Sequence, residues 1–260
     1  PSTLEETRAT RSASKRISST SMLTPESADF DQLSIHHDFV PVYRRLLSDS
    51  LTPVTAFRLL DDGGPACLFE SVIGGEKVGR YSFLAADPIK RFVARGNQVT
   101  ISDLRGSSNG GSGKTEELQS DDPLETFRSH VKYKVAEVAG LPPFVGGAIG
   151  YAGYDVVRYV ENLPNSPEDD RQLPDLDFAF YHTLCVFDHV DKTITVVSLA
   201  DCREVTNAAE SQQAFSKASQ QIDKTIAKLS QPTAHTPEEF TTEKPSPPLN
   251  IESNFTRETF

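Results

Sequence analysis

A series of short apolar runs separated by turn-forming residues places the strongest constraint on the fold of this chain. The pairs are residues 54–60 with 66–71, residues 91–95 with 98–102, and residues 178–187 with 193–199. Each pair predicts a β-hairpin, because the intervening Gly, Asn, Asp and Pro residues accept the backbone of tight turns. Three hairpins without an alternating strand–helix rhythm favour an α+β fold, with antiparallel sheets packed face to face as a β-sandwich.

Three further segments repeat apolar residues at helical spacing and predict helices that flank these sheets. They cover residues 37–49, 123–138 and 205–229. Pro41 and Pro123 fit the first turns of the first two, where the missing N–H is not needed. The residues around Thr256 are typical of the start of one more helix.

Polar segments divide the chain into parts. Residues 1–28 are rich in Ser, Thr and Arg, residues 106–120 in Gly and Ser, and residues 231–250 in Pro, Thr and Glu. Such compositions bury too little apolar surface to fold, so we expect poor order there. The predicted organisation is a tail at 1–29, one domain at 30–230, a linker at 231–250 and a last segment at 251–260 that holds the predicted helix start.

Composition and charge exclude several classes of protein. A net charge of -11 argues against a general nucleic-acid binder, and no apolar run is long enough to cross a membrane. Cys67, Cys185 and Cys202 lack paired spacing, which predicts reduced packing residues and a cytoplasmic protein. The Ser- and Arg-rich tail is similar to an organelle transit peptide, but Glu5 and Glu6 count against that alternative.

No motif in the sequence supplies a catalytic or metal centre. Residues 110–115 imitate a phosphate-binding loop, but Ser108 stands where its first glycine belongs and an acidic turn follows. The glycines of residues 146–153 lack dinucleotide spacing and predict tight packing in a strand. Zinc-ligand spacing and the serine-hydrolase elbow are both missing.

A carboxylate and two hydroxyls form the remaining candidate site. Glu70 and Ser71 end one apolar run, and Ser82 follows in the next. Glu70 could bind an ammonium group through a charge-assisted hydrogen bond, while either serine could donate or accept. From spacing alone, a solvated strand end is the alternative interpretation.

These residues resemble the Leu-Leu-Glu-Ser-x10-Ser signature of the tryptophan site in anthranilate synthase component I, with Phe69 in place of the second leucine. Further landmarks of that family follow in order at residues 79–83, 87–88, 144–158, 173–175, 187–189 and 253–260. The resemblance covers about residues 30–260 and identifies the chain as the amino-terminal part of such a subunit, with residues 251–260 as the truncated start of its chorismate-binding catalytic domain.

The resemblance implies a tryptophan-binding site made by Glu70, Ser71, Tyr81 and Ser82. It also implies a complete enzyme that converts chorismate and glutamine-derived ammonia to anthranilate and pyruvate, with feedback inhibition by tryptophan. The implied partner is the glutamine amidotransferase subunit, component II. Mg²⁺ and the catalytic residues belong to the catalytic domain of that family, so no catalytic residue is transferred and the fragment alone is expected to be inactive.

Two other functions remain open from the sequence. The related aminodeoxychorismate synthase of folate synthesis shares the fold, although Glu70 tells against it because that family commonly lacks this carboxylate. A stand-alone amino-acid-binding module is the second alternative.

Overall fold

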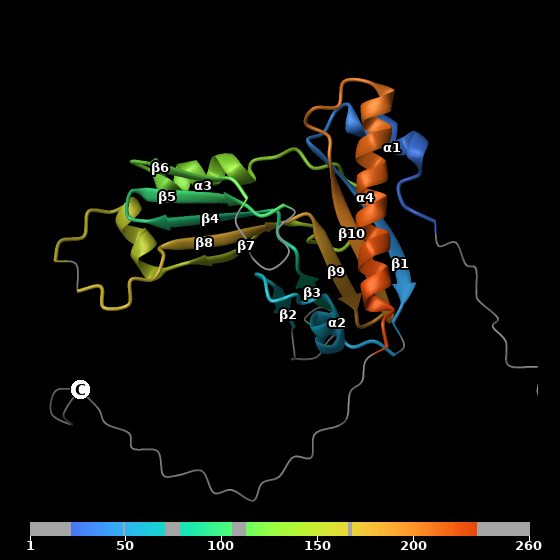
Figure 1. Cartoon of the computed structure of the whole chain (residues 1–260), viewed down its shortest axis with the longest axis horizontal. Coiled ribbons are helices and arrows are strands. Elements are labelled where there is room, and N and C mark those ends of the chain that lie inside the picture. The colour runs from blue at the N-terminus through green and yellow to red at the C-terminus, as the bar shows by residue number, and fades with distance from the viewer. Residues whose placement is uncertain (1–21, 49, 71–78, 106–112, 166–167, 233–260) are drawn as a thin grey trace, which may run out of the picture.

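The computed structural model describes residues 22–48, 50–70, 79–105, 113–165 and 168–232, and it contains two five-stranded antiparallel sheets (Figure 1). Sheet A has the order β1 (Phe39–Leu47), β10 (Thr193–Asp201), β9 (Thr183–Asp188), β3 (Tyr81–Ala85) and β2 (Cys67–Phe69). Sheet B has the order β6 (Thr115–Gln119), β5 (Gln98–Asp103), β4 (Lys90–Arg95), β8 (Leu176–Tyr181) and β7 (Gly147–Ala152). The predicted α+β class with antiparallel sheets is confirmed.

Three helices cover one face of sheet A: α1 (Ser27–Ser34), α2 (Pro53–Leu60) and α4 (Ala208–Leu229). The helix predicted at 205–229 is thus confirmed as α4, which begins after Asn207, whose side chain accepts from the Glu210 N–H. Its buried side chains include Ala214, Ala218 and Ile222. These apolar side chains pack on the strands of sheet A and form the largest core cluster in the described residues.

The first predicted helix is wrong, because residues 39–47 form β1. β1 pairs with β10 from Phe39 opposite Asp201 to Leu47 opposite Thr193. Phe39, Val40, Val42 and Tyr43 are all buried, so successive residues on both faces are apolar. A strand buried on both faces loses its two-residue alternation and imitates helical spacing. Pro41 is tolerated because β1 lies at an edge of the sheet.

The first predicted hairpin is also wrong. Residues 53–60 form α2, in which Pro53 stands in the first turn and Thr52 accepts from the Thr55 N–H. The neighbouring run, 66–71, does contain a strand, but β2 pairs with β3 rather than with residues 54–60. The threonine cap before the proline was the local signal for a helix.

Sheet B contains the hairpin predicted at 91–95 and 98–102. β4 and β5 pair around Gly96, whose φ of +50° lies in the region that favours glycine. α3 (Pro123–Val131) and the 3₁₀ helix η1 (Tyr154–Tyr159) pack on this sheet around the buried Phe92. The helix predicted at 123–138 ends at Val131, because the chain turns there to run beside β1.

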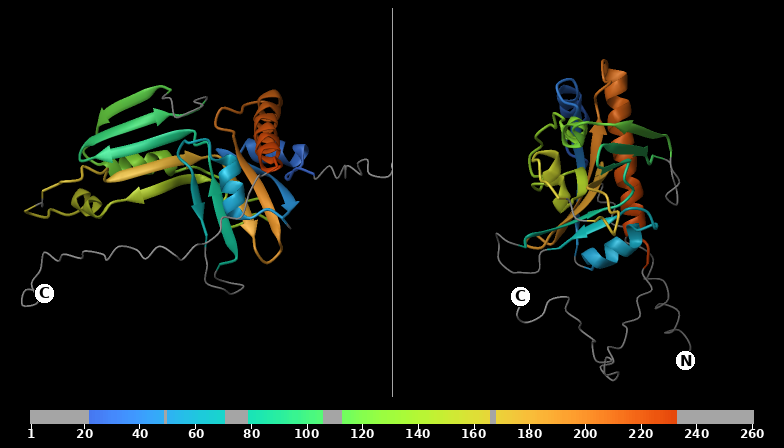
Figure 2. Two further views of the ribbon diagram at one scale, coloured as in Figure 1. Left: turned by 60° about the horizontal axis from the view of Figure 1, so that its bottom comes forward. Right: turned by 90° about the vertical axis from the view of Figure 1, so that its left-hand side faces the viewer.

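The third predicted hairpin is correct in its turn and incomplete in its first strand. β9 and β10 pair, but residues 176–188 form two strands that belong to different sheets, β8 and β9, with a bend at His182. Figure 2 shows the strands of the two sheets running in different directions. A core cluster that includes Tyr43, Val197 and Tyr181 joins them. Face-to-face packing as a sandwich stays a prediction.

Two expectations of poor order fail in part. Ser27 already begins α1, and Thr24 forms a bridge with Tyr43, so ordered structure starts before residue 30. Residues 115–119 form β6. Residues 1–21, 106–112 and 233–260, which include the predicted linker from residue 233 onward and the predicted second domain, lie outside the described residues.

The three cysteines are free, and Cys185 and Cys202 are buried, as expected for packing residues. Burial raises the pKa of the Cys185 thiol to about 12. Within the described part of the chain, no helix is long and apolar enough to cross a membrane.

Candidate functional site

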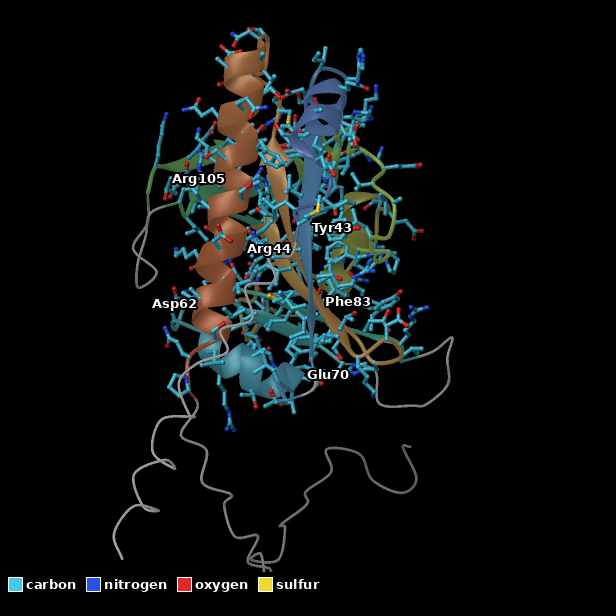
Figure 3. All side chains as sticks on the ribbon, turned by 90° about the vertical axis from the view of Figure 1, so that its right-hand side faces the viewer. Tyr43, Arg44, Asp62, Glu70, Phe83 and Arg105 are labelled. Atoms are coloured by element: carbon cyan, nitrogen blue, oxygen red, sulfur yellow. The ribbon has the colours of Figure 1, made fainter. Side chains whose placement is uncertain are left out.

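Glu70 and Ser82 lie at the β2–β3 edge of sheet A. β2 and β3 pair with Leu68 opposite Leu84 and Phe69 opposite Phe83. Continuing this register by one residue sets Glu70 opposite Ser82, and opposed residues of antiparallel strands share one face. Glu70 is exposed at this end of the sheet, near α2 (Figure 3). Two of the predicted tryptophan contacts thus lie near one edge of sheet A, Glu70 directly after β2 and Ser82 within β3.

Ser82 is almost completely buried, with 1% of its surface exposed. Its hydroxyl oxygen lies 2.7 Å from Nε2 of His189, which follows β9. Ser82 lies opposite Phe187 of β9 and two residues before Leu84 of its own strand. Both neighbours belong to the core cluster of sheet A. The Ser82 hydroxyl is thus a polar group in apolar surroundings, and the His189 side chain sets the direction of its hydrogen bond.

An ion pair fixes the same two strands beside Ser82. Arg80 donates from Nε and Nη2 to the Asp188 carboxylate, with the shortest distance 2.7 Å, and its guanidinium lies 5.1 Å from the centre of the Tyr81 ring. Burial opposes the charge of Asp188, but the hydrogen bonds from Arg80 and from the Val190 and Asp191 amides hold its carboxyl pKa below the usual value. The carboxylate is therefore ionised and rigidly held at neutral pH.

This arrangement joins two family landmarks that the sequence shows only as separate motifs. Residues 79–83 supply Arg80 and Ser82, and residues 187–189 supply Asp188 and His189. The roles of Arg80, Asp188 and His189 were missed, because the partners lie more than a hundred residues apart in the chain.

Of the other two predicted contacts, only Tyr81 is described by the structure. Tyr81 precedes Ser82 in β3, so its side chain faces the opposite side of the sheet, where it packs into the cluster between the sheets. Ser71 lies outside the described residues. A ligand that touches Ser82 could reach Tyr81 only around the end of β3.

The glycine-rich segment serves packing, as predicted. Gly150 lies opposite Phe178 in the β7–β8 pair, and a Cβ added there would stand 1.9 Å from the Asp177 carbonyl oxygen. No side chain larger than hydrogen fits without moving the strands apart. The neighbouring landmark residue Asp175 likewise supports structure, since its carboxylate accepts from the Gly96 N–H and the Tyr159 hydroxyl.

The phosphate-loop imitation at 110–115 does not open a helix, because Thr115 begins β6. Among the described residues, no group of three His, Cys, Asp or Glu side chains could hold a metal ion. The described part of the chain therefore gives no site that fits Mg²⁺, and no chemical step through a metal is derived for it.

A hollow of about 1440 Å³ opens beside α4, lined among others by Asp62, Arg105 and His182. Figure 3 shows Arg105 and Asp62 on one side of α4 and Glu70 on the other. Neither Glu70 nor Ser82 lines this hollow. The predicted amino-acid contacts thus lie outside it.

The antiparallel fold and the paired landmark motifs agree with the comparisons with known proteins. Residues 64–260 match the family model of chorismate binding enzymes, and the chain belongs to this family. The resemblance to anthranilate synthase component I is also confirmed by similar proteins that carry that name.

The chain is 42% identical over 180 residues to the chloroplastic anthranilate synthase alpha subunit 2 of Arabidopsis thaliana, which covers 65% of this chain and 28% of that protein. It is 33% identical over 177 residues to anthranilate synthase component 1 of Acetivibrio thermocellus, with 68% and 34% covered. A solved structure of anthranilate synthase component I from Streptococcus pneumoniae aligns with 24% identity and a TM-score of 0.44, over 73% of this chain and 37% of that one. The chain spans about a third of the length of these relatives.

Proposed function

We propose that this chain is the amino-terminal, tryptophan-sensing part of an anthranilate synthase large subunit. The observation that carries the proposal is the position of Glu70 directly after β2 and of Ser82 on the neighbouring β3, with the Ser82 hydroxyl 2.7 Å from His189 Nε2. A carboxylate and a hydroxyl on one face suit the ammonium and carboxylate of an amino acid. The names of the similar proteins favour this function over the folate enzyme and the stand-alone module.

The complete enzyme would convert chorismate and glutamine-derived ammonia to anthranilate and pyruvate, with Mg²⁺ in its catalytic domain and a glutamine amidotransferase subunit as its partner. Tryptophan would inhibit it from this remote site by binding the inactive arrangement more tightly than the active one. Such a coupling is typically about 1 to 3 kcal/mol. We also propose that sheets A and B are the two layers of a β-sandwich, and that the protein is cytoplasmic.

The proposal is tested in the complete enzyme by Glu70→Gln and Ser71→Ala. Glu70→Gln keeps the shape of the side chain and removes the charge that pairs with the ammonium. Ser71→Ala leaves a ligand group unpaired, which costs roughly 1 to 3 kcal/mol of binding. Each variant should need about tenfold to a hundredfold more tryptophan for half inhibition, measured relative to its own turnover without tryptophan.

Glu117→Gln is the matched control, since Glu117 is an exposed carboxylate on β6 of the other sheet. It should be inhibited like the parent. If the Glu70 and Ser71 variants were also inhibited like the parent, the site would be assigned to the wrong residues. The 260-residue chain alone should make no anthranilate from chorismate, Mg²⁺ and ammonium, and fluorescence of the product reports this directly.

A further inference from the structure

The strongest unassigned feature beside the proposed site is the contact between Ser82 and His189. The Ser82 oxygen and His189 Nε2 are 2.7 Å apart, a short distance for a hydrogen bond between a hydroxyl and a ring nitrogen. Ser82 is buried, whereas His189 is half-buried. A buried hydroxyl needs a hydrogen-bond partner, and the partner here is a ring nitrogen that can either donate or accept.

The backbone at His189 is tied to the start of β3. The backbone N–H of His189 donates to the Arg80 carbonyl oxygen at 2.8 Å. Asp188, the residue before His189, accepts hydrogen bonds from the Arg80 guanidinium. Tyr81 lies opposite Asp188 in the β3–β9 pair. The backbone of His189 is therefore fixed to the start of the strand that carries Ser82, and its ring nitrogen Nε2 lies within hydrogen-bond distance of the Ser82 hydroxyl.

The protonation of Nε2 decides what the Ser82 hydroxyl can offer. If Nε2 accepts, the hydroxyl proton points at the ring, and only oxygen lone pairs remain for a ligand. If Nε2 carries the proton and donates, the hydroxyl proton is free to donate elsewhere. A carboxylate accepts hydrogen bonds only, and Glu70 already supplies the acceptor for an ammonium group. The second arrangement is the one that completes a site for an amino acid.

We propose that His189 is a positioning residue of the amino-acid site: it donates to Ser82 and thereby aims the Ser82 hydroxyl at the ligand carboxylate. The inference rests on the proposed function and deepens it by dividing the ligand between two groups. Glu70 holds the ammonium, and the Ser82–His189 pair holds the carboxylate. The ligand class is an α-amino acid, and His189 acts on it only through Ser82.

The test is a double-mutant cycle on tryptophan inhibition of the complete enzyme, with Ser82→Ala, His189→Phe and the double variant. Phenylalanine keeps a ring of similar size and lacks the nitrogen. Each single change should raise the half-inhibiting tryptophan concentration about tenfold or more. The double variant should be no worse than Ser82→Ala alone, because a residue that acts only through Ser82 has no effect once the hydroxyl is gone.

His189→Gln provides the rescue, since its side-chain amide can donate to Ser82. It should return the inhibiting concentration to within about threefold of the parent, and it also carries the test if His189→Phe does not fold. Loss of inhibition in His189→Gln comparable to that of Ser82→Ala would then overturn the inference. His37→Gln is the control, because His37 bonds the Leu33 carbonyl at the end of α1, away from β3; it should behave like the parent.

Two results separate this inference from the proposed function. If Ser82→Ala weakens inhibition and His189→Phe does not, or if their effects add in the double variant, His189 does not position Ser82 and the inference is wrong. If Glu70→Gln and Ser82→Ala both leave inhibition unchanged, the proposed tryptophan site itself is wrong.

Discussion

The two sheets are of equal size but differ in how they are covered. In sheet A, seven consecutive residues of β10, from Ile194 to Ala200, are buried, with helices on one face and the cluster between the sheets on the other. In sheet B, the edge strands β6 and β7 are largely exposed. A strand that is buried on both faces is held by its core contacts, whereas a strand without a buried residue depends on its backbone pairing. The proposed site stands on sheet A, where Ser82 of β3 is buried beside this core.

The largest effect that separates the two sheets should come from truncating the core. Ile222 on α4 is fully buried against sheet A, so Ile222→Ala should lower the free energy of unfolding by about 2 to 5 kcal/mol. Leu118 on β6 is only half-buried, and Leu118→Ala should cost less than about 2 kcal/mol. Urea unfolding followed by circular dichroism measures both.

Gln220→Ala on the exposed face of α4 serves as the control and should change the free energy of unfolding by less than about 0.5 kcal/mol. Equal losses for Ile222→Ala and Leu118→Ala would contradict the contrast between the sheets.

A smaller effect, confined to sheet B, is expected from Gly150→Ala. The added methyl group would meet the Asp177 carbonyl oxygen, so β7 should be forced away from β8 at a cost of about 1 to 3 kcal/mol. Hydrogen exchange should become faster in β7 and β8 while α4 and β10 remain protected. Gly153→Ala is the matched control three residues further on, because its nearest neighbour would be 3.5 Å away and its φ of -68° suits alanine. If Gly150→Ala and Gly153→Ala changed hydrogen exchange in β7 and β8 to the same extent, the close approach at Gly150 would not be what holds β7 in place.

The smallest of the three effects is a pH dependence of the free energy of unfolding that comes from His182, at the junction of the two sheets. Burial, helped by Arg203, Lys90 and Arg105 and opposed by Asp201, lowers the pKa of His182 to about 4. The unfolded chain, in which a histidine titrates near its usual value of about 6.5, binds more protons between these values. The free energy of unfolding should therefore fall as pH drops from about 6.5 to 4, with a share from His182 of about 1 to 2 kcal/mol after allowance for the partly exposed ring.

In His182→Gln this share should vanish, so the free energy of unfolding should change less between pH 7 and pH 4.5 than in the parent. His36→Gln, at an exposed histidine after α1, should keep the parent's dependence. If the free energy of unfolding of His182→Gln changed with pH as much as that of the parent, His182 would not be the source of this pH dependence.

Local signals in the sequence predicted the elements that local chemistry determines. Gly96 predicted the β4–β5 turn, and the periodic apolar face predicted α4. β1 was mistaken for a helix because burial on both faces removed its alternation, and burial is a property of the assembled fold. The same limit applies to the site. The order of motifs predicted Glu70 and Ser82, but no local pattern predicts that His189 lies beside Ser82, since only sheet pairing brings them together.

The bend at His182 gives the molecule a mechanical property. A single residue separates β8 of sheet B from β9 of sheet A, and its carbonyl is tied to the Leu199 N–H of β10. A change in the angle between the sheets would turn the torsion angles of this residue, together with those of the other short link between the sheets, residues 86–89 between β3 and β4. From His182 to Asp188, at the proposed site, β9 forms a lever arm of six residues, about 20 Å at the usual rise of a strand. A ligand bound at the proposed site would therefore contact β9 at this distance from the bend.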